Sequence, residues 1–403
     1  MADREPAAPV AVQIGAGKIG RGLMGELFFA SGYRTVFADI DRPLVEALRA
    51  RGSYDVHHVA NEGSTPAHVA NFSALDANNI ETVAEAIAGA ALVCTAVGAR
   101  NLPDVAPSIA RSLAVRIRRG AAAPLNIIAC ENLVGAGQRL GDRVWSEFTN
   151  LSNQDRGATG GTACGMARPE FDARFGFVGA VVSRTVPAPP EEIRRRDPLW
   201  LACETVSRLR VDAAAFRGPV PRVIDMDPVA NFVAYEQQKL VSHNMSHTVA
   251  AYLGYQAGCE FIWQAIADAS IAGAVRGAMD ETGRALVSRF GFDPAEQRAY
   301  EEDLLRRYGN RALGDQVRRV AADPVRKLGP QDRLIGSARL CFEEGVDPRF
   351  VVAGIQAALA YHNTDDAGAV RLQEMLSSRG REAVLRDVCG LSPGEPLYGR
   401  LRE

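Results

Sequence analysis

The chain has 403 residues, of which 47% are hydrophobic and 23% are charged, and its formal net charge is −2. This balance is typical of a globular protein with two or three domains, and the lack of a basic excess argues against nucleic acid as a partner. No run of about 18 apolar residues, no signal-peptide pattern and no C-x-x-C pair occurs, so we expect a cytoplasmic protein with reduced cysteines and no membrane span.

The first half of the chain alternates predicted strands with predicted helices. An apolar run at 11–15 precedes a glycine-rich turn and an amphipathic pattern, and a second apolar run follows at 34–41. Because such strands are typical of a parallel sheet covered on both faces, we predict a doubly wound α/β fold. The further predicted strands are 91–98, 125–132, 175–190 and a segment at 200–212 that could extend the sheet, with helices at 79–90 and 104–118.

The second half of the chain has helical periodicity and few strand-like runs. The pattern changes at about residue 216, so we predict an α/β domain over 1–215 and an all-helical domain over 216–403. The helical patterns cover 228–253, 259–290, 295–307, 330–344 and 348–361.

A glycine motif follows the first strand directly. Residues 15–20 read G-x-G-x-x-G and open a helix, so the N–H groups of the helix N-terminus can hold a pyrophosphate. Asp39 ends the second strand, where a carboxylate can accept hydrogen bonds from a ribose and repel a 2′-phosphate. We therefore predict a Rossmann-type domain that binds NAD, with NADP left open by Arg42; the alternative is a turn without a ligand, with Asp39 as a helix cap. The residues expected at the cofactor are Gly15, Gly17, Lys18, Ile19, Gly20 and Asp39.

A group of polar side chains marks the first helical pattern of the second domain. On an α-helix of about 100° per residue, Lys239, His243 and His247 share one side, with Glu236 and Asn244 on or near it. Only three of the 46 basic residues are lysines, so a retained lysine suggests a task that arginine cannot perform, such as losing a proton. From periodicity alone, a solvated polar stripe explains the pattern equally well.

The two histidines of this helix are four residues apart, a spacing that suits a metal. However, the sequence HNMSH lacks the glutamate of the H-E-x-x-H motif, and no third ligand stands nearby. We therefore predict that no metal is bound.

With these motifs together, the chain resembles the polyol-specific long-chain dehydrogenases from Val12 to about Cys389. The markers are IGAGKIGRG (14–22), FADID (37–41), TAVG (95–98), PLNIIACEN (124–132), the K-x4-N-x2-H spacing from Lys239 to His247, AYLG (251–254) and RVAADPVRKLGPQDRLI (319–335). The resemblance implies a Rossmann domain followed by a helical domain, NAD with Val97 among its contacts, and metal-independent hydride transfer on a small-molecule substrate.

The resemblance also implies roles for single residues. Lys239 matches the family's general base, and His247 matches a histidine that orients the substrate. Asn132 and Asn244 match two amides that hold the substrate oxygen. Oxidation of a secondary alcohol needs such a base for the hydroxyl proton and such donors for the alkoxide-like oxygen. Without the resemblance, Asn132 also reads as a strand-end cap and Asn244 as a satisfied helix amide.

Four cations within 319–333 match or adjoin the family's substrate pocket. They suit a phosphate through bidentate arginine bonds and a lysine charge, but Arg326 and Arg333 could instead pair with Asp323 and Asp332 at a surface helix end. The implied reaction interconverts a polyol phosphate and a ketose phosphate, with mannitol 1-phosphate and fructose 6-phosphate as the first pair to test. The four cations are Arg319, Arg326, Lys327 and Arg333.

Three departures from the family pattern leave the substrate open. Ser183 replaces the acid of the family's V-D-R-I-V-P strand, His243 is unusual beside Asn244, and residues 148–170 are expected to form a longer Gly/Thr-rich loop. An unphosphorylated polyol or a phosphorylated cyclitol therefore remains an alternative substrate, and a non-catalytic NAD-sensing protein is an alternative of another class. A monomer and a small homo-oligomer are both compatible with the sequence.

Overall fold

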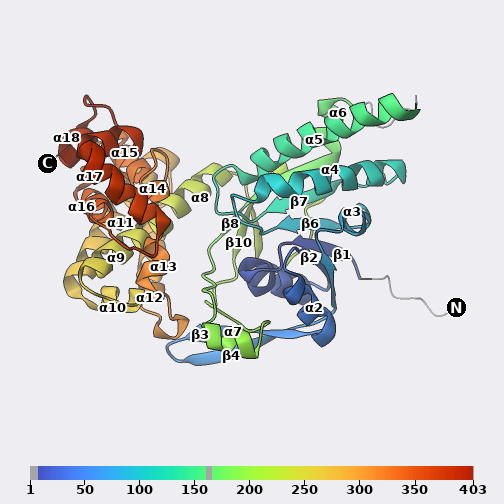
Figure 1. Cartoon of the computed structure of the whole chain (residues 1–403), viewed down its shortest axis with the longest axis horizontal. Coiled ribbons are helices and arrows are strands. Elements are labelled where there is room, and N and C mark those ends of the chain that lie inside the picture. Colours follow the sequence, from blue (N-terminus) through green and yellow to red (C-terminus); the bar gives the residue numbers. More distant parts are fainter. Residues whose placement is uncertain (1–7, 160–165, 403) are drawn as a thin grey trace. The chain divides into compact units, whose positions relative to one another are not determined.

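A computed structural model describes residues 8–159 and 166–402 of the chain. The chain divides into two units, Met1–Phe232 and Val233–Glu403. In Figure 1 the first unit runs from blue through green, and the second from yellow to red.

The first unit is built on a sheet of eight strands. These are β1 (Val10–Ile14), β2 (Arg34–Asp39), β5 (Phe72–Asp76), β6 (Leu92–Thr95), β7 (Leu125–Ala129), β8 (Phe175–Val182), β10 (Leu209–Asp212) and β11 (Met226–Val229). Their order in the sheet is β11-β10-β8-β7-β6-β1-β2-β5. All neighbours are parallel except β8 and β10. The order reverses between β1 and β6, so a crevice is expected at the carboxyl ends of these strands.

Helices cover both faces of this sheet. They are η1 (a π-helix, Gly20–Gly25), α1 (Glu26–Ala30), α2 (Arg42–Arg51), α3 (Ile80–Ala88), α4 (Leu102–Arg118), α5 (Ala136–Thr159), α6 (Arg168–Arg174), α7 (Glu191–Arg196) and the 3-10 turn η2 (Ala213–Ala215). Neighbouring residues of a strand point to opposite faces. Val12 accordingly packs in one core with α3, α4 and α5, and Ala11 packs in another with Leu27 and Phe28 of α1. The predicted doubly wound α/β fold is confirmed.

A second sheet of three strands lies in the same unit, and the sequence did not predict it. It consists of β3 (Tyr54–Ala60), β4 (Gly63–Val69) and β9 (Leu201–Cys203), in the order β4-β3-β9. Strand β4 is exposed along most of its length, so it lacks the apolar alternation that would reveal a strand. The predicted segment at 200–212 is therefore divided between the two sheets, as β9 and β10.

The loop predicted at 148–170 is wrong over most of its described length. Helix α5 continues to Thr159 and α6 begins at Arg168, while residues 160–165 lie outside the described part of the chain. Phe148 is buried, and its ring lies 5.2 Å from that of Phe171 in α6. This aromatic contact packs the two helices together despite the polar sequence between them.

The second unit is helical, as predicted. Its elements are α8 (Phe232–Gln238, beginning at the last residue of the first unit), η3 (a π-helix, Lys239–Asn244), α9 (Met245–Gln256), α10 (Ile262–Ala267), α11 (Ala269–Phe290), α12 (Pro294–Tyr308), η4 (a 3-10 turn, Arg311–Leu313), α13 (Val317–Ala321), α14 (Pro324–Lys327), α15 (Ile335–Glu343), α16 (Arg349–Leu359), α17 (Ala367–Asp387) and α18 (Pro396–Arg402). No helix within the described ranges is long and apolar enough to cross a membrane.

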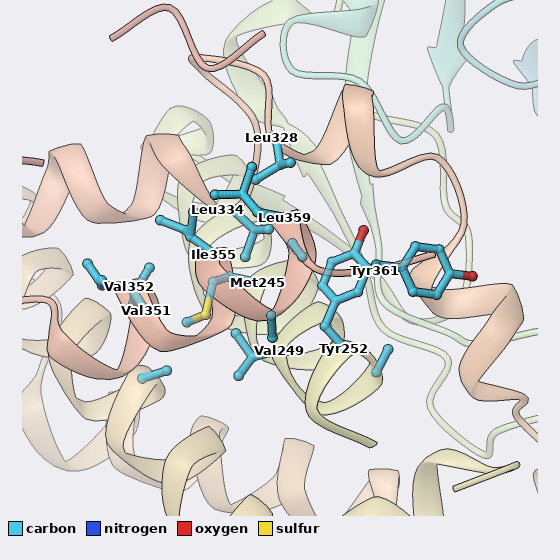
Figure 2. Packing of buried hydrophobic residues seen from close by; sticks show 14 of the residues in the cluster. Met245, Val249, Tyr252, Leu328, Leu334, Val351, Val352, Ile355, Leu359 and Tyr361 are labelled. Carbon is cyan, nitrogen blue, oxygen red and sulfur yellow. The ribbon is translucent and has the colours of Figure 1, made fainter. Parts of the chain in front are cut away.

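Helix α9 lies at the centre of this unit. Met245, Val249 and Tyr252 are fully buried, and Figure 2 shows them among side chains of α16 and of the segments just before α15 and just after α16. The Tyr252 hydroxyl donates to the Ala321 carbonyl at 2.9 Å, and its ring meets that of Tyr361 edge-on at 5.3 Å. The polar segment that leads into α9 is therefore attached to a helix that is largely buried.

The first unit extends beyond the boundary at residues 215 and 216 that the sequence suggested. Strand β11 pairs with β10 in the sheet. Phe232 packs against β8, because a Cβ added to Gly179 would lie 2.6 Å from its ring. These contacts keep the segment up to Phe232 with the sheet.

Candidate active site

The glycine turn between β1 and η1 has the backbone that a phosphate-binding turn needs. Gly15 has a φ of +87°, and a Cβ on it would lie 2.6 Å from a backbone oxygen just after β6. A Cβ on Gly20 would lie 1.9 Å from the carbonyl oxygen of Gly15. A Cβ on Gly17 would meet nothing within 4 Å, so the outer side of the turn is open. From inside, the buried guanidinium of Arg21 donates to the Ala16 carbonyl at 2.7 Å.

The carboxylate that ends β2 is attached to this turn. Asp39 Oδ2 accepts a hydrogen bond from the Ala16 N–H at 2.6 Å, and Oδ1 accepts one from the Asp41 N–H at 2.9 Å. Each oxygen keeps a second lone pair for a ribose hydroxyl. Arg42, which left NADP open, donates to Asp76 at 2.9 Å. Because Arg42 is paired with Asp76, the site matches NAD better than NADP, whose 2′-phosphate would need that arginine.

A buried carboxylate joins the ends of β6 and β7. Glu131 is 5% exposed; its Oε2 accepts from the Thr95 hydroxyl at 2.9 Å and its Oε1 from the Val97 N–H at 3.1 Å. Burial raises the pKa of this carboxyl, and the two hydrogen bonds oppose the rise. Val97 lies against the glycine turn, since a Cβ on Gly15 would come within 3.1 Å of its Cγ1. Glu131 thus fixes Val97, and the residue that follows it, Asn132, is exposed.

The segment that carries the predicted base is a π-helix rather than an α-helix. It extends from Lys239 to Asn244 and continues directly into α9. On a regular α-helix, a residue five positions on would lie about 140° around the axis. The i→i+5 hydrogen bonds of a π-helix bring that residue back above the first, and such segments are frequent at functional sites. Lys239 and Asn244 are therefore closer to one face than the α-helical prediction placed them.

The structure adds a carboxylate behind His247. The imidazole Nε2 lies 2.9 Å from Asp315 Oδ2, and Arg319 donates to Asp315 Oδ1 at 2.6 and 2.7 Å. Burial alone would raise the pKa of this carboxyl, but His247 and Arg319 lower it below its ordinary value. Tyr308 stacks on the imidazole at 4.7 Å with only 10° between the planes. Of the residues predicted at the site, His247 and Arg319 are therefore connected through a side chain that the sequence reading missed.

His243 is buried against the same region. Burial lowers its pKa well below the ordinary value, and the nearby charges of Arg307, His247, Lys239 and Arg333 act in the same direction. Its ring is 6.2 Å from that of His247 between centroids. Among the described residues, no group of three histidine, cysteine or acidic side chains is placed to hold a metal.

The predicted phosphate cations lie in and after α13 and α14. Arg326 pairs with Asp323 at 3.2 Å and with Asp332 at 3.3 Å, and the buried Arg333 pairs with Asp332 at 2.8 Å. The remaining cation, Lys327, is also buried and donates to the Ala322 carbonyl. Burial and the charges of the two arginines lower its pKa to about 7. The pairs with aspartate that the sequence left open are therefore present.

The predicted residues form two local groups, one in each unit. In the first unit the glycine turn, Asp39, Val97 and Asn132 gather at the carboxyl ends of β1, β2, β6 and β7; Lys18 is exposed and Ile19 is half-buried there. In the second unit Lys239, Asn244 and His247 lie on η3 and α9, next to Asp315 and Arg319. Sequence reasoning missed Glu131 and Asp315. Glu131 directly precedes Asn132, and Asp315 precedes Arg319 by four residues. A predicted site residue close in sequence could therefore have drawn attention to each of them.

Both units match a known family model. The mannitol dehydrogenase Rossmann domain matches residues 9–224, and the mannitol dehydrogenase C-terminal domain matches residues 231–388. The chain is 37% identical over 394 residues to a mannitol-1-phosphate 5-dehydrogenase of Brevibacillus brevis, covering 98% of this chain and 97% of that protein. It is 36% identical to the protein of the same name from Bacillus licheniformis, covering 96% and 97% of the two chains.

Solved structures share the fold at lower identity. Mannitol 2-dehydrogenase of Pseudomonas fluorescens, in a ternary complex with NAD and D-mannitol, superposes with a TM-score of 0.76 at 17% identity, over 98% of this chain and 92% of that one. A substrate-free D-sorbitol dehydrogenase superposes with a TM-score of 0.70 at 17% identity, over 90% and 84%.

Proposed function

Because the chain belongs to the mannitol dehydrogenase family and is an NAD-dependent dehydrogenase, we propose that it interconverts a polyol phosphate and the corresponding ketose phosphate. The observation that carries the substrate class is the identity of 36–37% to mannitol-1-phosphate 5-dehydrogenases over nearly the whole chain. Mannitol 1-phosphate and fructose 6-phosphate are the pair proposed.

The first unit fits the cofactor. The side of the turn above Gly17 is open, while a Cβ on Gly15 or Gly20 would collide with backbone, so this turn can be approached closely by a pyrophosphate. Asp39 and Val97, both fixed by hydrogen bonds to the backbone or to Glu131, would line the same site. When bound, the nicotinamide ring accepts the hydride that leaves the substrate carbon.

Four side chains carry the acid–base chemistry and hold the substrate in this proposal. Lys239 takes the hydroxyl proton of the secondary alcohol, and this chain has only two other lysines. Asn132 and Asn244 donate hydrogen bonds to the oxygen as it becomes alkoxide-like, and His247 orients the substrate. In this proposal the fixed amides do what a Lewis acid would otherwise do, so the reaction proceeds without a metal.

A free polyol is the second candidate substrate, because three of the four cations proposed for a phosphate are already paired with carboxylates. Three carboxylates, Asp315, Asp323 and Asp332, stand among the four predicted cations. A phosphate must therefore compete with these carboxylates or use Lys327. In the resemblance, Ser183 also replaces an acid near the substrate.

The deciding experiment compares matched substrates with and without phosphate. The chain is assayed by NADH absorbance with mannitol 1-phosphate, mannitol, fructose 6-phosphate, fructose and a cyclitol phosphate, in buffer that contains a chelator. We expect the phosphate esters to give a kcat/KM higher by several powers of ten, since each charge-assisted bond to a phosphate is worth about 1.5–3 kcal/mol.

Equal turnover of mannitol and its phosphate would assign the enzyme to free polyols. Turnover that the chelator abolishes and zinc restores would overturn the metal-independent mechanism. If NAD binds and none of the substrates reacts, the chain is not a catalyst of this class.

A further inference from the structure

Asp315 occupies a position between two side chains of the proposed site. It lies just before α13, at the point where the Phe261–Gln316 bridge joins two segments, and its own carbonyl accepts from the Ile262 N–H at 2.9 Å. The backbone is therefore fixed independently of the side chain. Each carboxylate oxygen has one partner, His247 at Oδ2 and Arg319 at Oδ1, and the residue is 5% exposed.

The charge of this carboxylate determines the donor in its contact with His247. An ionised carboxylate only accepts hydrogen bonds, so the imidazole must donate from Nε2. In the neutral ring the other nitrogen, Nδ1, then carries a lone pair and can accept a hydrogen bond from a substrate hydroxyl. The stacked Tyr308 ring keeps the imidazole plane from turning, and the Tyr308 hydroxyl donates to the backbone carbonyl of His243 at 2.9 Å.

We propose that Asp315 is a positioning residue that holds His247 in the Nε2–H tautomer and Arg319 in a fixed orientation, so that both present defined groups to a hydroxylated substrate. The proposal rests on the proposed function for its substrate, but the tautomer is a property of the protein alone. No other acidic side chain is within 4.0 Å of the His247 ring nitrogens among the described ion pairs.

The substitution Asp315→Asn has a defined consequence. Arg319 has donors only, so it attracts the amide oxygen of Asn to the position of Oδ1. The amide NH2 is then turned toward His247 and needs an acceptor at Nε2. The neutral imidazole can accept this hydrogen bond at Nε2 only in the Nδ1–H tautomer. Nδ1, the atom left for the substrate, then donates a hydrogen bond instead of accepting one.

The first measurement uses the unmodified full-length chain without substrate. Long-range ¹H–¹⁵N spectra of the imidazoles distinguish the two tautomers, and His247→Gln identifies the signal among the six histidines. We expect the Nε2–H form in the wild type and the Nδ1–H form in Asp315→Asn. A wild-type Nδ1–H tautomer overturns the proposal, whether or not any variant folds.

The second measurement is kinetic and uses the best substrate of the proposed function. We expect Asp315→Asn to lower kcat/KM roughly 10- to 100-fold, by analogy with carboxylates that orient metal-bound histidines. Asp315→Glu, which keeps an ionised acceptor, should retain the wild-type tautomer and recover part of the activity. Asp280→Asn, the same change in an exposed pair with Arg284 on α11, should match the wild type.

The two failures are distinguishable. If no polyol or ketose is turned over, the proposed function fails while the spectra still test Asp315. If substrates react but Asp315→Asn keeps both the wild-type tautomer and the wild-type kcat/KM, the positioning role is refuted.

Discussion

The lysine at position 239 stands at the first residue of a π-helix, in a protein whose basic residues are almost all arginine. An arginine cannot lose its proton under physiological conditions, whereas an amine can when its surroundings favour the neutral form. Lys239 is half-buried at the start of this segment. The chemistry proposed for this residue therefore depends on proton loss rather than on charge.

Replacement of Lys239 tests that dependence directly. We expect Lys239→Ala to lower kcat about 10²- to 10⁴-fold, the usual contribution of a general base, while NAD affinity stays near the wild-type value. Lys239→Arg should be nearly as inactive although it keeps the charge. Rates are followed by NADH absorbance and affinity by fluorescence titration, and a small primary amine should restore part of the activity of Lys239→Ala. Wild-type kcat in Lys239→Arg would rule out the proton-transfer role.

Lys327 shows how burial changes the protonation of a lysine. Burial and the charges of Arg333 and Arg326 lower its pKa from 10.5 to about 7. Because the ammonium is harder to form in the folded chain than in the unfolded one, this group reduces stability below about pH 7, and the cost disappears as the pH rises toward 10.5. For an anionic ligand the sign is opposite, since the charge that attracts it is lost above pH 7.

The resulting prediction concerns KM. Between pH 7 and 9 the substrate phosphate is already a dianion, with a second pKa of about 6, so it contributes no further change. If Lys327 holds the phosphate, KM should rise by up to ~10-fold per pH unit above the pKa of the lysine. Lys327→Arg stays charged over this range, so its KM should remain flat. The same slope in the wild type and in Lys327→Arg would show that another group is responsible.

At the scale of elements, the glycine turn and η3 have different tasks in the proposed reaction. The turn binds the cofactor, and η3 carries the base. The turn is tight because Gly20 lies directly on the carbonyl oxygen of Gly15, and Arg21 ties it to the segment before β9 through the Leu199 carbonyl. The π-helix η3 instead widens the helix locally, which brings two polar residues five positions apart toward one face. Each element places functional groups through backbone geometry.

Three glycine substitutions separate the packing of the turn from its binding. In Gly20→Ala the new Cβ would lie 1.9 Å from a backbone oxygen that cannot move aside, so we expect a loss of about 1–3 kcal/mol in unfolding free energy and weak NAD binding. Gly17→Ala meets nothing within 4 Å, so its Tm should be unchanged while NAD binds less tightly.

Gly273→Ala, in the open on α11, is the control and should leave NAD binding unchanged. Thermal melts and NAD titrations of the three variants check the prediction. An unchanged Tm in Gly20→Ala would contradict the close approach on which the turn depends.

At the scale of the whole molecule, each unit has a core of its own. The sheet of the first unit is covered on both faces, and the second unit is organised around the buried helix α9. The cofactor residues belong to the first unit, whereas the proposed base and the cations belong to the second. Asn132, three residues after β7, is the one predicted catalytic residue on the first unit.

Local regularities of the sequence were sufficient for much of this architecture. Apolar runs with helices between them indicated the doubly wound sheet, and the G-x-G-x-x-G turn after β1 indicated the dinucleotide site, because both signals lie within a few neighbouring residues. The fold class and the cofactor were predicted correctly from such patterns, and the family was predicted correctly from the resemblance of the motifs. The exposed strand β4 and the helix over residues 148–159 were not predicted, because neither has the apolar periodicity on which the prediction relies.

The sequence by itself thus determined the fold class, the family and the residue types available for chemistry, because periodicity and motif spacing are properties of short segments. Only the tertiary structure decided which of those residues are joined. Asp315 meets His247 across 68 positions of sequence, Glu131 reaches Thr95 and Val97 from the next strand, and Arg319 of α13 and Arg326 of α14 already have carboxylate partners. Such contacts depend on how distant segments pack and on which charged groups are buried and must therefore pair. The sequence pattern of a single segment carries no information on either.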